Sequence, residues 1–277
     1  MNANPTPGLK EFLRLRETKL PRGGRAGGGF RFPRAMVPNS PALAAWRGGR
    51  LPRTTSLVMV LALFITLVLA YLAGSLPTGF LVARAMRVDI TRVGSGNIGA
   101  TNVFRVLGKG PGALVLTVDL LKGALAVSFA PALAVALAPA NSLALPALAA
   151  LGAVLGHNYT CWLRFKGGKG VATALGVLLA LSPPVGVTTL CTWIIIAYTY
   201  RYSSLAALVA AIFAPIYQLL LFGPGVKLVA IFLMSVILIY RHRGNIANLR
   251  AGTETRLARR SEKKPQEDSA PEQAKDG

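Results

Sequence analysis

Long apolar runs alternate with short polar or basic segments along most of the chain. Residues 56–83 contain no charged side chain in 28 positions, and about 20 apolar residues are enough to cross the hydrocarbon of a bilayer. Further apolar runs cover residues 112–138, 142–163, 171–182, 185–200, 205–222 and 226–240. Because backbone polar groups in lipid must be satisfied within their own segment, each run predicts a helix.

The pattern therefore predicts an all-α integral membrane protein with about seven transmembrane helices. The run at 171–182 is short for a span, and it ends at Pro183-Pro184, where a helix cannot continue unbroken. Six spans with one re-entrant segment is the alternative.

Basic residues gather on one side of this predicted bundle. With seven spans, that side receives the basic residues of 84–109, those of 164–169, Arg201 and the segment from Arg241, whereas only Lys227 lies near the opposite short loops. Cytoplasmic loops carry the excess of Lys and Arg in membrane proteins. The motif loops on the basic side are therefore predicted to be cytoplasmic, with the amino terminus outside.

The two ends of the chain differ from this membrane domain, which is predicted to cover residues 56–253. Residues 1–55 hold 11 Lys or Arg against two Glu, are rich in Gly and Pro, and are predicted to be a disordered basic extension. A basic arm outside the membrane conflicts with the charge rule. Either the true start lies nearer Met59, which we favour, or the arm is a targeting presequence. Residues 254–277 are predicted to be a polar, solvated cytoplasmic tail.

The formal net charge of +21 narrows the choice of partners. Because the excess is divided between the extension and the loop ends, membrane lipid headgroups and phosphorylated substrates suit it better than nucleic acid, for which we expect no role. Cys161 and Cys191 lie in apolar runs and only two His are present. We therefore expect no disulfide framework, no metal site and no cofactor.

The first candidate site is residues 94–105, GSGNIGATNVFR, a small, polar segment between two apolar runs. Glycines let the backbone curl closely around a ligand and present N–H groups to phosphate oxygens. We expect the segment to open the second span, where a helix start attracts anions. A flexible polar loop is the alternative. The candidate residues are Gly94, Ser95, Gly96, Asn97, Gly99, Thr101, Asn102 and Arg105.

The second candidate site is residues 165–173, FKGGKGVAT, which also opens a predicted helix. It is not a nucleotide-binding P-loop, because Leu163 stands where the first Gly is required and Gly170 replaces the Ser or Thr. Lysines that snorkel at a membrane boundary are the alternative for Lys166 in particular. The candidate residues for binding phosphate are Gly167, Gly168, Lys169, Gly170 and Thr173.

The third candidate site is residues 240–254, YRHRGNIANLRAGTE. His242 and Asn245 are three apart, so a helix would place them on one face, and His titrates near neutral pH. His242 could therefore handle a proton or bind phosphate. The alternative is that it is only a residue at the membrane interface. Glu254 is expected to pair with Arg250 and Arg256 and so position the segment.

Two opposite charges, Asp119 and Lys122, lie three residues apart inside the second apolar run. Charges in a span are costly unless they are paired or face a polar cavity. We expect a structural salt bridge that points inward near the first segment, with direct ligand contact as the alternative.

These segments resemble, in order and spacing, the motifs of the bacterial acyl-phosphate:glycerol-3-phosphate acyltransferases of the PlsY type. The matching stretches are residues 94–105, DLLKG at 119–123, GHNYTCWLRFKGGKGVAT at 156–173 and HRGNIANLRAGTETRL at 242–257, within a resemblance that runs from about Leu69 to Leu257.

The resemblance implies a seven-span enzyme of the bacterial inner membrane that acts in phospholipid biosynthesis. It would transfer a fatty acyl group from acyl phosphate, and not from acyl-CoA or acyl-ACP, to glycerol 3-phosphate, giving lysophosphatidic acid and phosphate. It also implies a functional link to a soluble acyl-ACP:phosphate acyltransferase of the PlsX type, which would supply the donor.

The resemblance also implies roles for particular residues. Ser95, Arg105, Lys169, His242 and Asn245 match the positions implied to be catalytic, and Glu254 matches the acidic position that follows them. Ser95 is expected to orient a substrate, because no GxSxG motif surrounds it. A membrane transporter for phosphate or an organophosphate is the alternative function. Against it, the three segments fall on one side of the membrane and not at its midplane.

Overall fold

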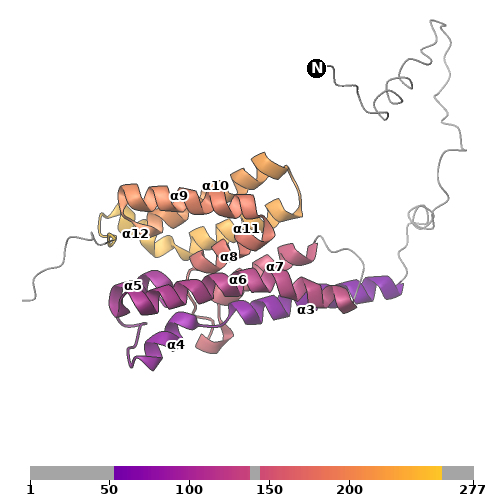
Figure 1. Cartoon of the computed structure of the whole chain (residues 1–277), viewed down its shortest axis with the longest axis horizontal. Helices are drawn as coiled ribbons and strands as arrows, with labels where there is room; N and C mark the ends of the chain where they lie inside the picture. Colours follow the sequence, from indigo (N-terminus) through magenta and orange to yellow (C-terminus); the bar gives the residue numbers. More distant parts are fainter. Residues whose placement is uncertain (1–52, 138–143, 258–277) are drawn as a thin grey trace, which may run out of the picture. The chain divides into compact units, whose positions relative to one another are not determined.

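The computed structural model describes residues 53–137 and 144–257, and this part of the chain folds into helices joined by short loops. The extension predicted for residues 1–55 and the tail predicted for residues 254–277 lie largely outside the described residues. The elements are α3 (Arg53–Gly74), α4 (Thr78–Ala85), α5 (Ala100–Leu107), α6 (Lys109–Leu137), α7 (Ala144–Asn158), η2 (Cys161–Leu163), α8 (Val171–Leu181), α9 (Pro183–Tyr200), α10 (Ser203–Phe222), α11 (Val226–Arg241) and α12 (Arg243–Arg250) (Figure 1).

Every predicted apolar run contains helix, so the all-α prediction is confirmed. Within the described residues, the stretches Leu57–Ala85, Lys109–Ala134 and Ser203–Phe222 are long and apolar enough to cross a membrane. The helices α7, α8 and α11 are shorter, with 15, 11 and 16 residues. The number of seven spans therefore stays a prediction.

The first apolar run is interrupted, which the sequence pattern did not indicate. Helix α3 ends at Gly74 and α4 begins at Thr78, and Pro77 between them has no N–H with which to continue a helical ladder. The carbonyl of Leu76 accepts a hydrogen bond of 2.7 Å from Nζ of Lys122 on α6. A charged side chain from another helix thus satisfies the backbone at the break.

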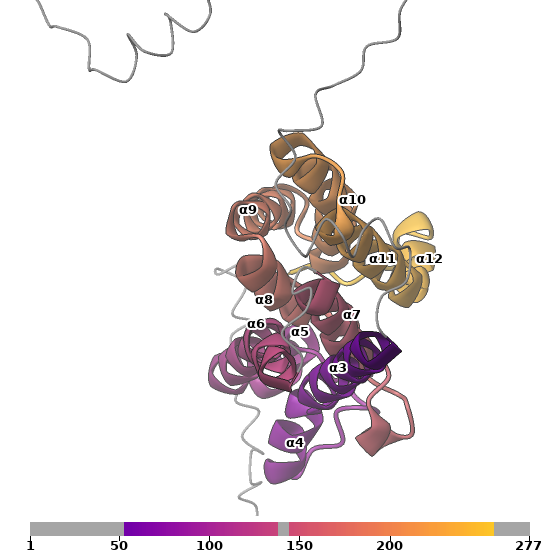
Figure 2. The ribbon, with the colours of Figure 1, turned by 90° about the vertical axis from the view of Figure 1, so that its right-hand side faces the viewer.

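Small residues allow the helices to pack closely. Helix α3 packs on α7, α6 on α8, and α9 on α10, and Figure 2 shows α8 between α6 and α9. A Cβ added to Gly156 would lie 2.1 Å from the carbonyl oxygen of Tyr71, and one added to Gly176 would lie 1.9 Å from that of Leu120. Such close approach is typical of helix contacts within membranes.

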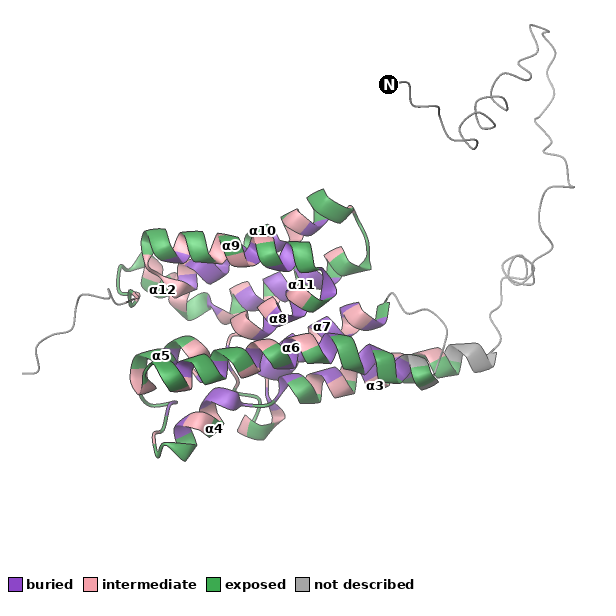
Figure 3. Cartoon of the chain, in the orientation of Figure 1, coloured by how far each residue is buried: buried purple, intermediate pink, exposed green. Residues whose placement is uncertain are grey.

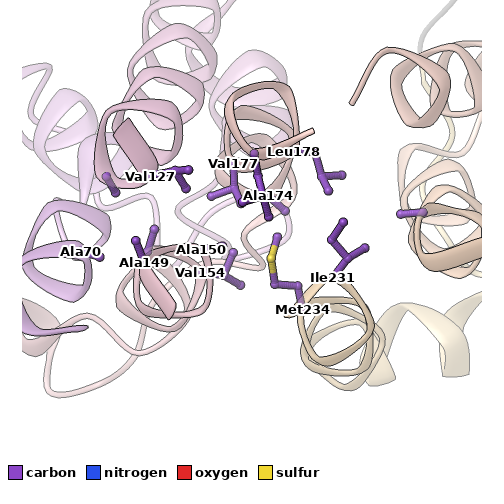
Figure 4. Packing of buried hydrophobic residues seen from close by; sticks show 14 of the residues in the cluster. Ala70, Val127, Ala149, Ala150, Val154, Ala174, Val177, Leu178, Ile231 and Met234 are labelled. Carbon is purple, nitrogen blue, oxygen red and sulfur yellow. The ribbon is translucent and has the colours of Figure 1, made fainter. Parts of the chain in front are cut away.

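The largest buried cluster joins α3, α6, α7, α8, α9, α10 and α11, with Val154, Val177 and Met234 among its members (Figure 4). Large apolar side chains such as Phe129 and Leu220 are exposed on outward faces (Figure 3), as expected where lipid and not water is the solvent. The short helices α5 and α12 lie at the same end of the bundle (Figure 1). The bundle thereby brings two candidate segments to one end.

Candidate active site

The first segment is a loop held in shape by one buried side chain, Asn102. Its Oδ1 accepts a 2.9 Å hydrogen bond from the backbone N–H of Ser95, and its Nδ2 donates to the carbonyls of Asn97 and Val93 at 2.9 and 3.1 Å. Gly94 and Gly96 have φ of 63° and 68°, a left-handed conformation that favours glycine. The loop presents Ser95 on the surface, whereas Asn102 is buried and shapes the loop.

The expectation that this segment opens the second span is wrong. Residues 100–107 form a separate eight-residue helix, α5, which begins after Gly99 and ends before Gly108. Gly108 has φ of 88°, so the chain turns before α6 begins at Lys109. Arg105 consequently lies exposed on a short helix of its own.

The second segment folds back on the end of α7. The backbone N–H groups of Gly167 and Gly168 donate to the carbonyls of Asn158 and His157, both at 3.1 Å. A Cβ on Gly168 would lie 2.2 Å from Nε2 of His157. These two glycines are therefore required for close approach of the backbone, and their N–H groups are engaged by carbonyls at the end of α7.

Arg241, at the end of α11, forms hydrogen bonds to this turn. Its guanidinium donates to the carbonyls of Gly167 and Gly168, each at 2.9 Å, and its Nε donates to Gly168 at 3.1 Å. It also lies 5.2 Å from the ring centre of Tyr159. The start of the third segment is thus hydrogen-bonded to the second segment.

Lys169 lies at one end of a hydrogen-bonded chain that joins the second and third segments. Its Nζ donates to Oδ1 of Asn245 at 2.5 Å, and Nδ2 of Asn245 donates to Oε1 of Glu254 at 2.7 Å. The hydroxyl of Ser204 on α10 donates to the same carboxylate oxygen at 2.6 Å. The expected pairing of Glu254 with Arg250 and Arg256 is wrong for the described residues, because the carboxylate is engaged by Asn245 and Ser204.

Electrostatics at Lys169 favour an arriving anion. Burial lowers the pKa of Lys169 below its ordinary value, the negative charge of Glu254 opposes this shift, and the positive charges of Arg241 and Arg105 add to it. Among the described residues, the charges of Arg241 and Arg105 therefore act on Lys169 from the third and first segments, and Glu254 is the carboxylate that opposes them. A phosphate bound here would relieve this repulsion.

His242 occupies the junction between α11 and α12, where it is the last cap of one helix and the first cap of the other. It is buried, and its Nδ1 lies 2.8 Å from the carbonyl of Leu238. A carbonyl only accepts, so Nδ1 carries the proton and Nε2 is the unprotonated nitrogen of the neutral ring. Burial lowers the pKa of His242 to about 4.

A buried polar network lies behind the second segment. Asp119 and Lys122 form the expected ion pair, at 2.8 Å, and Nδ1 of His157 lies 3.8 Å from Asp119 and 3.1 Å from the hydroxyl of Thr173. All four side chains are buried. The contacts of this network are with α7, α8 and the α3–α4 break, and not with the first segment. Thr173 is placed in this network, facing His157.

A pocket of about 570 Å³ connects the first and second segments. It lies between the loop that contains Gly96 and the turn that contains Gly167. Its lining residues are Thr91, Gly96, Ile98, Trp162, Leu163, Arg164, Lys166 and Gly167.

The structure thus brings Lys169, Asn245 and Glu254 into direct contact, with Arg105 close enough for its charge to act on Lys169. The sequence reasoning missed Arg241, Ser204 and His157. Arg241 stands between Tyr240 and His242 in the third motif, but nothing in the pattern separated it from the neighbouring arginines. Ser204 lies in a helix start far from all three motifs and carried no sequence signal.

The fold and the site define a helical protein with apolar helices long enough to cross a membrane and with cationic side chains gathered around Lys169. The sequence profile of the glycerol-3-phosphate acyltransferases matches residues 64–252. The chain therefore belongs to the glycerol-3-phosphate acyltransferase family, as its motifs predicted.

Individual relatives agree with this assignment. The glycerol-3-phosphate acyltransferase of Paraburkholderia xenovorans is 50% identical over 197 residues, which cover 71% of this chain and 91% of the relative. The chain also resembles two crystal structures of PlsY, an integral membrane glycerol 3-phosphate acyltransferase, each at 40% identity. The glycerol 3-phosphate form gives a TM-score of 0.64 over 71% of this chain and 96% of that chain. The lysophosphatidic acid form gives 0.62 over 71% and 95%. The protein is thus an acyltransferase and not a transporter.

Proposed function

We propose that the protein transfers a fatty acyl group from acyl phosphate to glycerol 3-phosphate, giving lysophosphatidic acid and inorganic phosphate. The observation that carries this proposal is the Lys169–Asn245–Glu254 chain, which holds an ammonium group beside the Gly167–Gly168 turn. Both substrates are phosphorylated, and the site offers Lys169 and Arg105 as cations for them. The two similar crystal structures are the glycerol 3-phosphate form and the lysophosphatidic acid form of that protein.

The reaction needs little beyond positioning and charge neutralisation. Acyl phosphate is a mixed anhydride and already activated, and holding two reactants in place supplies about 7 kcal/mol or more of barrier reduction. Lys169 and Arg105 neutralise the phosphates, and Ser95 orients a substrate from the exposed loop. Nε2 of His242, or a substrate phosphate, accepts the proton of the attacking hydroxyl.

The remaining predicted residues form two groups, those that shape the first loop and those that support the binding surface. Gly94, Gly96 and Gly99 shape the first loop, in which Asn97 accepts a 3.0 Å hydrogen bond from the N–H of Gly99. In this proposal Asn102, Gly167, Gly168, Gly170 and Thr173 hold the binding surface from beneath, together with Asp119 and Lys122.

The transfer is proposed to be direct, without an acyl-enzyme. Ser95 donates its backbone N–H to Asn102, and no histidine is among the recorded hydrogen-bond partners of the described residues around it, so a base that would activate its hydroxyl is missing there. Mass spectrometry of the protein incubated with acyl phosphate alone tests this step. The expected result is an unmodified chain. An added acyl group on Ser95 would overturn the direct transfer while leaving the overall reaction in place.

The finer membrane arrangement also belongs to the proposal. Seven spans would place the amino terminus outside and the motif loops at the cytoplasmic face of the bacterial inner membrane, with the acyl chain among the helices. The donor would then arrive from a soluble acyl-ACP:phosphate acyltransferase of the PlsX type. Protease access to the carboxy-terminal tail in sealed inverted vesicles tests this orientation, and protection of the tail would contradict it.

A further inference from the structure

The third segment does not stop at the end of α12. Residues Thr253–Leu257, which we call the strap, run back to the turn between α9 and α10. The N–H of Leu257 donates to the carbonyl of Arg201 at 2.7 Å, and the guanidinium of Arg201 donates to the carbonyl of Leu257. These two bonds form a closed clamp between the strap and the turn.

A second contact joins the neighbouring residues, Arg256 of the strap and Tyr202 of the turn. Nε of Arg256 donates to the hydroxyl of Tyr202 at 2.9 Å, and its guanidinium lies 5.4 Å from the centre of the Tyr202 ring. The strap is therefore attached at two consecutive positions. Residues predicted from sequence to be the beginning of a solvated tail are instead fixed to the helical bundle.

The strap carries Glu254, and through Glu254 it reaches the site. Oε1 of Glu254 accepts from Asn245, whose Oδ1 accepts from Lys169. Ordering a long lysine side chain costs rotamer entropy, so an acceptor that is already fixed lowers the cost of holding the ammonium in place. The anchoring of the strap thus helps to fix the orientation of the Lys169 side chain.

The same turn also contacts the first segment. The hydroxyl of Ser203 lies 3.3 Å from that of Thr101 on α5, the helix that carries Arg105. The turn between α9 and α10 therefore touches elements from the first and third segments, although it belongs to none of the three motifs.

We propose that the strap and its anchor, Arg201, are a positioning device that holds Lys169 in the orientation that binds glycerol 3-phosphate. This inference rests on the proposed function, because it assigns Lys169 to that substrate. Arg201 and Leu257 act through Glu254 and Asn245 and do not touch the substrate.

The clamp can be opened with a matched pair of variants at one position. Leu257→Pro removes the N–H that donates to Arg201, whereas Leu257→Ala keeps it and trims the side chain. We expect Leu257→Pro to raise KM for glycerol 3-phosphate about 10-fold, with a smaller effect on kcat. A factor of this size is expected when a hydrogen bond to a charged side chain, here Lys169, is no longer held in place. Leu257→Ala keeps KM within about twofold. Arg201→Gln, which removes the charge but keeps a donor, is expected to raise KM by a similar factor to Leu257→Pro.

The pH profile provides a readout that loss of folded protein would not move. Lys169 faces the carboxylate of Glu254 and the guanidinium groups of Arg241 and Arg105, and Glu254 is the one that raises its pKa. Releasing the strap moves Glu254 away, so the pKa of Lys169 falls and the alkaline limb of kcat/KM shifts to lower pH in Leu257→Pro. A general loss of folding would lower kcat and leave both KM and this limb where they were.

Direct binding of glycerol 3-phosphate, measured without donor by calorimetry, separates the strap from the proposed reaction. Weaker binding in Leu257→Pro than in Leu257→Ala supports the strap even if no product forms. Equal binding and equal KM in the two variants overturn it. Normal binding in the unmodified protein with no transfer from acyl phosphate would overturn the proposed donor alone.

Discussion

At the scale of the residue, Lys169 and His242 are the two titratable side chains most closely held by the site. Lys169 is bonded to Asn245 at 2.5 Å, and His242 to the carbonyl of Leu238 at 2.8 Å. Burial lowers the pKa of both. Lys169 is bonded to a residue of another segment and His242 to a residue one helical turn earlier. The two side chains differ in charge at neutral pH, because Lys169 is a cation when it binds phosphate and His242 is neutral.

Replacing Lys169 by Met is expected to raise KM for glycerol 3-phosphate by about 30-fold, which corresponds to a loss of about 2 kcal/mol from one charged hydrogen bond. Steady-state kinetics in detergent measures it. Lys109→Met is the matched control, since it removes the same charge from an exposed position at the start of α6 and is expected to change KM by less than about threefold. Equal effects of the two substitutions would show that only the overall positive charge matters.

The neutral state of His242 predicts how stability depends on pH. Its pKa is about 4 in the folded protein against an ordinary value of 6.5, so between these values the unfolded chain binds more protons than the folded one. Stability therefore rises with pH from 4 to 6.5, is complete above 6.5, and is lost as the pH falls toward 4. His242→Asn keeps a donor for Leu238 but cannot titrate.

The unmodified protein is expected to lose about 2 kcal/mol more than His242→Asn between pH 7 and pH 5. Unfolding in detergent at both pH values measures the difference. Identical losses in the two proteins would place the pKa of His242 near its ordinary value and contradict its burial as a neutral ring.

At the scale of the element, the turn at Gly167–Gly168 and the end of α7 form one packed unit. Gly168→Ala would place a Cβ 2.2 Å from Nε2 of His157, whose other nitrogen is bonded to Thr173. The expected cost is about 1–3 kcal/mol of stability. Gly244→Ala, in α12, meets nothing within 4 Å and is expected to stabilise by about 0.5–1 kcal/mol. Thermal unfolding compares them, and an equal shift in both would show that the turn is looser than its hydrogen bonds indicate.

Much of the element arrangement could be predicted from the sequence. The apolar runs located the helices because a chain in lipid has few alternatives to helix. The break at Pro77 was missed because the run around it is apolar throughout, and its hydrogen-bond donor, Lys122, comes from another helix. Helix α5 was missed because residues 94–105 were expected to lead directly into the second span, whereas Gly108 separates α5 from α6.

The partners within the site were harder to predict for a related reason. Spacing along the chain predicted that His242 and Asn245 share one helix face, but it could not indicate that Asn245 bonds to Lys169, which is 76 positions away. Likewise, nearby arginines suggested ion pairs for Glu254, whereas its hydroxyl partner, Ser204, is 50 positions away. The motifs indicated the candidate residues, and only the fold shows which of them touch.

At the scale of the whole molecule, the helical bundle separates an apolar environment along its outward faces from a polar environment at one end. Apolar side chains such as Phe129 and Leu220 are exposed, while the helices α5 and α12 lie at the same end of the bundle (Figure 1). A lipid donor and a water-soluble acceptor require this division, because the acyl chain and the phosphates need different solvents. The family assignment and the site together make acyl transfer between two phosphorylated molecules the central claim.

The most direct test is the choice of acyl donor by the purified protein in detergent. Labelled glycerol 3-phosphate is supplied with acyl phosphate, acyl-CoA or acyl-ACP of the same chain length, and lysophosphatidic acid and inorganic phosphate are both measured. The account predicts lysophosphatidic acid from acyl phosphate alone, with one phosphate released per product. Comparable product from acyl-CoA or acyl-ACP, or none from acyl phosphate in folded protein that binds glycerol 3-phosphate, would contradict it.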